Sequence, residues 1–151
     1  MGAVNVIEYI TIANTGNVTD FGDLSAIAQE NSGLSSPTRG IFTIATSAVN
    51  TIEYITIAST GNSTDFGDLS VARLRTGSCS SNTRGVFGGG HSGSSRLDVI
   101  DYITISSAGN ATDFGNLTAV REDTAGISSP TRGVFGGGIN TDGNEVNIIE
   151  Y

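Results

Sequence analysis

The chain has no lysine and no tryptophan, and it has one cysteine and two prolines among its 151 residues. The single cysteine, Cys79, excludes an intrachain disulfide and a thiolate metal cluster. All seven basic residues are arginines, and against 15 acids they give a net charge of −8. This sign disfavours binding to nucleic acid or to an anionic membrane, so we expect neither partner. No apolar run reaches the roughly 18 residues of a membrane span, and the N-terminus lacks signal-peptide features. We therefore expect no membrane insertion, and we expect the chain to be synthesised in a cytoplasm.

What the chain does contain is one segment in three near-copies. The tripeptide Thr-Arg-Gly begins at Thr38, Thr83 and Thr131, at intervals of 45 and 48 residues. A second motif, Ile-Glu/Asp-Tyr, begins at Ile7, Ile52, Ile100 and Ile149. A period in the forties indicates an array of supersecondary units, each unable to bury its apolar face alone. We expect one repeat domain over residues 1–151, with units of approximately 5–49, 50–97 and 98–146, and with 147–151 starting a further strand.

Each copy contains short strand signals, which we label a to d by their expected pairing order. The c segments are rich in β-branched and aromatic residues and cover 5–12, 50–57 and 98–105. A Gly-Asn turn joins each to a d segment, at 19–24, 64–69 and 112–117. The a segments are 33–36, 78–81 and 126–129, and the glycine-rich b segments are 85–90 and 133–138. Because helix signals are nearly absent, the sequence predicts an all-β fold. We expect the glycine runs to lie where a neighbouring backbone leaves no room for side chains.

Four antiparallel strands in about 47 residues match one propeller blade. The units also contain the doublets Gly88-Gly89 and Gly136-Gly137, a tyrosine in strand c, an aromatic in strand d and an arginine before the doublet. In these residues the chain resembles the kelch repeat. Strand d carries Phe where kelch repeats usually carry Trp, and the first unit lacks the doublet. The amino-acid sequences of the repeats are also similar to those of repeat-rich virion proteins of tailed phages that infect cyanobacteria. The resemblance implies a kelch-like β-propeller with about three four-stranded blades per chain.

Three blades do not close a ring, because closed propellers have roughly 4–8 blades. Two chains give six blades, so we expect a homodimer in which a second copy completes the ring. The C-terminal Ile148-Ile-Glu-Tyr151 repeats the N-terminal Val6-Ile-Glu-Tyr9, so the two segments compete for one position. This redundancy predicts strand exchange; alternatively, the chain is a fragment of a longer array.

Charged residues recur at fixed positions in the units: Arg39, Arg84 and Arg132, and Asp20, Asp65 and Asp113. We expect the arginines to pair with the aspartates as structural contacts; a ring of arginines that binds an anion is the alternative. The Asp-Phe-Gly-Asp motif is interpreted as a structural turn, because two acids per copy fall short of the 6–8 oxygens that calcium requires. We expect no metal and no cofactor.

The units diverge in their d–a and b–c connections, which a meander places on one face. Loops on a rigid scaffold carry recognition, so this variable face is the predicted ligand surface. Its candidate contacts are Arg73, Arg75, His91, Arg96 and Arg121. A lone histidine, a cysteine in an inner strand and serines outside a nucleophile motif predict no catalytic residue.

The sequence therefore predicts a non-enzymatic structural or binding module. The resemblance implies a phage virion or adhesion component that contacts a protein or a glycan. The alternatives are an intracellular kelch-type interaction scaffold or a fragment of a longer propeller lectin.

Overall fold

The structure is a computed structural model that describes residues 4–151, and it is all-β. These residues form four antiparallel sheets and no helix, so none of their elements is an apolar helix long enough to cross a membrane. The strands are β1 (Val4–Tyr9), β2 (Thr19–Ala28), β3 (Gly33–Ser35), β4 (Arg39–Thr43), β5 (Thr51–Thr56), β6 (Thr64–Asp68), β7 (Gly77–Ser80), β8 (Arg84–Gly88), β9 (Val99–Thr104), β10 (Thr112–Asn116), β11 (Ala125–Ser128), β12 (Gly133–Gly136) and β13 (Ile149–Glu150).

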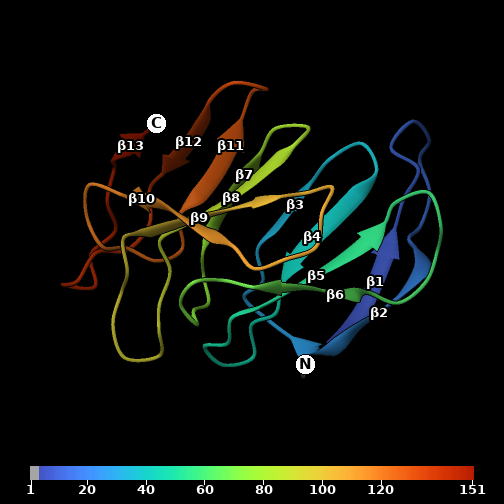
Figure 1. The fold of residues 1–151 in the computed structure, drawn as a ribbon, viewed down its shortest axis with the longest axis horizontal. Helices are drawn as coiled ribbons and strands as arrows, with labels where there is room; N and C mark the ends of the chain where they lie inside the picture. Colours follow the sequence, from blue (N-terminus) through green and yellow to red (C-terminus); the bar gives the residue numbers. More distant parts are fainter. Residues whose placement is uncertain (1–3) are drawn as a thin grey trace.

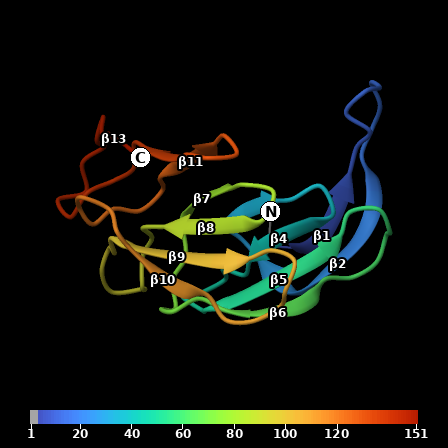
Figure 2. The same ribbon diagram turned by 45° about the horizontal axis from the view of Figure 1, so that its top comes forward.

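Each sheet is a simple meander of consecutive strands. The first sheet is β1-β2, the second β3-β4-β5-β6, the third β7-β8-β9-β10 and the fourth β11-β12-β13. They follow one another through the molecule in chain order, so that β1–β2 and β13 lie at opposite ends (Figures 1 and 2). The predicted a, b, c and d segments coincide with the four strands of the second and third sheets. The first sheet holds only c and d, and the fourth holds only a, b and a short c.

A β-bulge in each d strand explains the Asp-Phe-Gly motif. In the second sheet Glu53 pairs with Asp65 and Ile52 pairs with Gly67, so Phe66 is the extra residue. The bulge turns the phenylalanine towards the tyrosine of strand c in the same sheet. The ring centroids of Tyr54 and Phe66 are 6.0 Å apart in an edge-to-face arrangement, and the other two units show the same geometry. The motif is therefore a bulged strand that places an aromatic pair, and not the turn that we expected.

The Gly-Asn segments also differ from the prediction. In the second sheet the turn lies before this segment, where the Ser59 N–H donates to the Thr56 carbonyl (3.1 Å), and Gly61 and Asn62 follow it outside any turn. Instead the segment packs against the preceding sheet: the Gly61 N–H donates to the Phe21 carbonyl (2.7 Å), and Asn62 Oδ1 accepts from the Asp23 N–H (3.0 Å). A Cβ on Gly67 would lie 2.5 Å from the carbonyl oxygen of Gly109. Glycine is required because two backbones meet there.

The core lies between successive sheets. One buried cluster contains Ile41 and Phe66 of the second sheet with Phe87 and Ile103 of the third. At the end of strand b, a Cβ on Gly88 would lie 2.9 Å from the ring of Phe135 in the fourth sheet. A Cβ on Gly89 would lie 2.6 Å from the carbonyl oxygen of Arg121, so the predicted crowding by a neighbouring backbone is confirmed at this doublet. At the doublet Gly136-Gly137 no backbone atom lies closer than 3.8 Å to an added Cβ. Each sheet thus buries its face on its neighbour, and the two terminal sheets have one neighbour each.

Candidate functional site

The d–a and b–c connections meet at one end of the sheets, as the meander order predicts. The backbone of His91, in the b–c loop of the third sheet, forms bridges with Leu74 in the preceding d–a connection and with Arg96. The next boundary repeats the pattern, where Ile139 bridges Glu122 and Glu145. These backbone bonds bring the variable segments into one surface, which we call the loop face.

Arg75, Arg96 and His91 lie together on the loop face. Arg75 contacts Glu30 (2.7 Å) and Glu122 (3.1 Å), and Arg96 contacts the other oxygen of Glu122 (2.6 Å). The hydrogen bond from Arg75 lowers the pKa of Glu30, and its bonds to Glu30 and Glu122 raise the pKa of Arg75. Both arginines keep part of their side chains exposed. Polar groups here can bind a ligand, but their charges are already neutralised by acids.

Arg73 and Arg121 lie differently from the surface contacts that we expected. Arg73 has 0% exposure and its guanidinium is 3.0 Å from Asp101 in the next sheet. Burial lowers the pKa of Arg73, and the charge of Asp101 opposes that effect. Arg121 is likewise buried and forms an ion pair with Glu150. These two residues join neighbouring sheets, and sequence reasoning missed this because an arginine in a divergent segment suggests a surface position.

A signal for these contacts was present in the sequence. Each Ile-Glu/Asp-Tyr motif places an acid within an apolar strand, and a buried acid requires partners. Asp101 accepts hydrogen bonds from the Ser70 backbone (2.9 Å) and hydroxyl (2.6 Å) of the preceding sheet. Glu53 receives the equivalent bonds from Ser25.

The recurring arginines stack on tyrosines. The guanidinium carbons of Arg39, Arg84 and Arg132 lie 4.5, 4.3 and 4.6 Å from the ring centroids of Tyr54, Tyr102 and Tyr151. The expected pairing with Asp20, Asp65 and Asp113 is not found among the ion pairs of residues 4–151. The reason is the sheet order: strand c separates strand b from strand d, and its tyrosine is the nearer neighbour of the arginine.

The remaining candidates for chemistry are isolated. Asp20, Asp65 and Asp113 are exposed, and in the described part of the chain no three His, Cys, Asp or Glu side chains gather in a geometry that could hold a metal ion. Cys79 is buried, and burial raises the pKa of its thiol, which disfavours the reactive thiolate. His91 Nδ1 accepts a hydrogen bond from the Gly93 N–H (2.9 Å).

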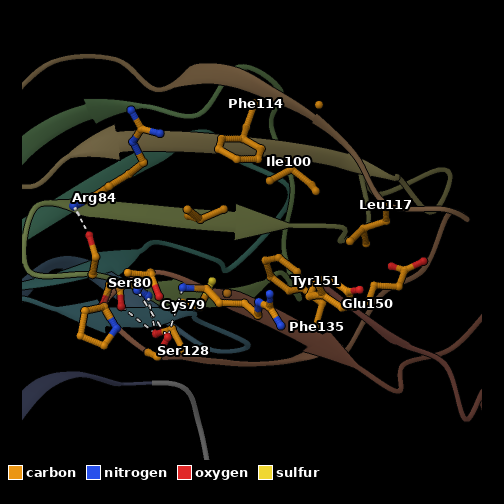
Figure 3. A pocket seen from close by; sticks show the side chains of 18 of the residues that line it. Cys79, Ser80, Arg84, Ile100, Phe114, Leu117, Ser128, Phe135, Glu150 and Tyr151 are labelled. Atoms are coloured by element: carbon orange, nitrogen blue, oxygen red, sulfur yellow. Dashed lines mark hydrogen bonds between the residues drawn. The ribbon is translucent and has the colours of Figure 1, made fainter.

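A cleft of about 800 Å³ separates the third and fourth sheets. Phe114 and Leu117 lie on one wall, and Phe135 and Tyr151 lie on the other (Figure 3). The fourth sheet has no d strand, and the cleft opens beside the position where that strand lies in the second and third sheets.

No protein-family model and no curated protein matches the chain.

Proposed function

We propose that the chain is part of a kelch-like β-propeller, completed by a second copy, and that it acts as a non-enzymatic binding or structural module. The support for a propeller is the repetition of the boundary between sheets. The d strands β2 and β6 each receive the Gly-Asn segment of the next sheet. The acids Glu53, Asp101 and Glu150 of the c strands each receive a bond from a serine or threonine that follows or belongs to the preceding d strand. A repeated boundary of one kind rotates every sheet relative to the last in the same way, which is the geometry of radially arranged blades.

One observation carries the non-enzymatic role: the recurring charged and aromatic side chains contact one another or a neighbouring sheet. Arg73, Arg121, Asp101 and Glu150 join sheets, and Arg39 donates to the Ile105 carbonyl of the next sheet (2.8 Å). The repeat is thus a scaffold, and the loop face is the surface free to vary without disturbing it. We propose that Arg75, His91 and Arg96 contribute to a ligand site there.

The resemblance to phage virion proteins makes a virion or adhesion component the leading role, with a glycan or a protein as the ligand. The paired arginines and acids of the loop face favour an uncharged, hydroxyl-rich ligand. A ligand hydroxyl can accept a hydrogen bond from an arginine or donate one to an acid, and the arginine and the acid still neutralise each other. An intracellular interaction scaffold would use the same face for a protein ligand.

A glycan array probed with the labelled full chain tests this proposal. We expect binding to a set of related glycans, with the signal reduced about tenfold or more by Arg96→Ala or His91→Ala. Asp65→Asn is the control, because Asp65 is exposed at the start of β6, outside the loop face. Glycan binding that survives the loop variants and is lost in the control would contradict the site. A silent array, with a protein ligand lost in the same loop variants, would favour the scaffold.

A further inference from the structure

The two ends of the array carry complementary halves of the same boundary. The Gly-Asn segments of the second and third sheets pack on β2 and β6, respectively. By contrast, β10 receives no such segment within the described chain, and the segment 14–18 of the first sheet has no preceding d strand to contact. We propose that the β1–β2 hairpin of a second copy docks on β10 and β12 and takes the place of β13. This inference rests on the proposed propeller architecture and specifies its interface.

The backbone contacts have two precedents within the chain. At the boundary of the second and third sheets, the Gly109 N–H donates to Phe66 (2.6 Å), and the Ala111 N–H donates to Asp68 (2.7 Å). Phe114 and Asn116 of β10 are the equivalent acceptors, and the equivalent donors are the partner's Gly16 and the partner's Val18. A Cβ on Gly115 would meet no atom within 4 Å, so the close approach that fixes Gly67 is vacant at Gly115.

The apolar side chains at the two ends match in the same register. Phe66 is 2% exposed because Ile103, Ile105 and Ala111 of the next sheet pack against it. Its equivalent Phe114 is 55% exposed. The residues equivalent to that cover are Ile10, Ile12 and Val18, and all three are exposed. Ile12 is 94% exposed, whereas its equivalents at the two internal boundaries, Ile57 and Ile105, are 45% and 1% exposed. Docking would bury both sets together.

The charges also match. Glu53 accepts a bond from Ser63 (2.5 Å), and the preceding unit has Ala28 where the later units have arginine. Asp101 has Ala111 at the serine position, and the preceding unit supplies Arg73. An acid thus has either a serine in its own unit or an arginine in the preceding one. Glu8 is exposed in one chain and has Val18 at the serine position, so docking, which would bury it, calls for an arginine partner. Arg121 is that arginine.

β13 occupies the strand c position of the fourth sheet. It pairs with β12 through two residue pairs, whereas β9 pairs with β8 through five. Its Glu150 holds Arg121, and Tyr151 lies under Arg132 while remaining 86% exposed. The partner's Glu8 and the partner's Tyr9 would take these two contacts, since both belong to the same motif. β1 is the longer strand, has six residues and has a free edge on the side that faces strand b in the other sheets.

The chain's own β1–β2 hairpin does not reach β10, because the first and fourth sheets lie at opposite ends of the molecule (Figures 1 and 2), so we assign the position to the hairpin of a second copy. The partner's β2 would then fill the cleft beside Phe135 as the missing d strand. If each copy donates its β1–β2 hairpin to the other, both exposed ends of each chain are covered and the assembly closes with two chains.

Paired cysteines test the interface. Asp68→Cys with Ala111→Cys is the control, because these residues share the equivalent hydrogen bond within one chain. We expect the control to cross-link within the chain and the Val18→Cys, Asn116→Cys variant to form a covalent dimer on a non-reducing gel. A closed control with no cross-link between positions 18 and 116 would overturn the interface alone. Failure of the control would instead contradict the sheet arrangement and the proposed architecture. A ladder of larger species would contradict closure by two chains.

A surface substitution gives a second test that leaves the single chain intact. Ile12→Asp places a charge on a side chain that is 94% exposed in one chain and would be buried at the interface. We expect it to weaken dimerisation on the order of 100-fold. Val71→Asp is the matched control, because Val71 is exposed in the connection after β6, remote from both ends. Equal dimerisation of both variants would overturn the proposal, as would occupation of β10 by a different protein with no self-association.

Discussion

At the scale of single residues, Arg73 is the most informative side chain, because a buried arginine is stable only while its acid is present. Removing one member of a buried ion pair leaves an uncompensated charge. We expect Arg73→Ala to reduce the free energy of unfolding by about 3 kcal/mol, measured by urea denaturation.

The residues around Glu53 in the second sheet suggest substitutions that should compensate for the loss of Arg73. Adding Asp101→Glu and Ala111→Ser to Arg73→Ala recreates the residues around Glu53, where serine takes the place of arginine. We expect the triple variant to recover much of the lost stability. A triple variant no more stable than Arg73→Ala would show that serine and arginine are not equivalent partners of this acid.

The pair of Glu30 and Arg75 predicts a small dependence of stability on pH. The hydrogen bond from Arg75 lowers the pKa of Glu30 below its ordinary value. The pair therefore contributes stability above the unfolded-state pKa, and this contribution is lost as the pH falls through the lower folded-state pKa. Denaturation of Glu30→Gln and the native chain across acidic pH should show a difference that shrinks towards low pH. Because the pair is partly exposed, salt should also reduce it. A difference that grows in acid would contradict the assignment.

At the scale of elements, glycines fix the spacing between sheets. Gly67→Ala would place its Cβ 2.5 Å from the carbonyl oxygen of Gly109, in a φ of 141°. We expect a loss of roughly 2 kcal/mol or more, because both the backbone strain and the lost bonds between sheets act in the same direction.

Gly16→Ala is the control for this prediction, because a Cβ there would meet no atom within 4 Å, and neither would a Cβ on its equivalent Gly61, which is packed on the preceding sheet. We expect its unfolding curve to stay close to that of the native chain. Equal losses for both variants would mean that glycine content, and not the contact between sheets, decides stability.

The strands could be predicted from the sequence because their signals are local. β-branched residues, the Gly-Gly doublets and the repeat period placed all four strands of a unit correctly. The contacts between sheets could not, because they join residues in different copies. The Gly-Asn segment suggested a tight turn, and only its neighbour β2 or β6 shows that it binds an adjacent strand. Arg73 suggested a ligand contact for the same reason, and Asp101 in the next sheet shows its role.

At the scale of the whole molecule, the chain has a repeating interior and two unlike ends. The Gly-Asn contacts and the apolar cover of the d-strand phenylalanine, which join internal sheets, leave one half exposed at β10 and the other at β1–β2. This complementarity is the central claim, because a sheet array with exposed apolar ends is expected to associate until those ends are covered. The loop face lies on a different surface, so ligand binding and assembly can be measured separately.

The measurement that tests the claim most directly is the mass of the full chain in solution, by light scattering after size exclusion. The account predicts a single species near twice 15.4 kDa, shifted towards one chain by Ile12→Asp and unchanged by Val71→Asp. A native chain that remains at 15.4 kDa at micromolar concentrations would contradict it.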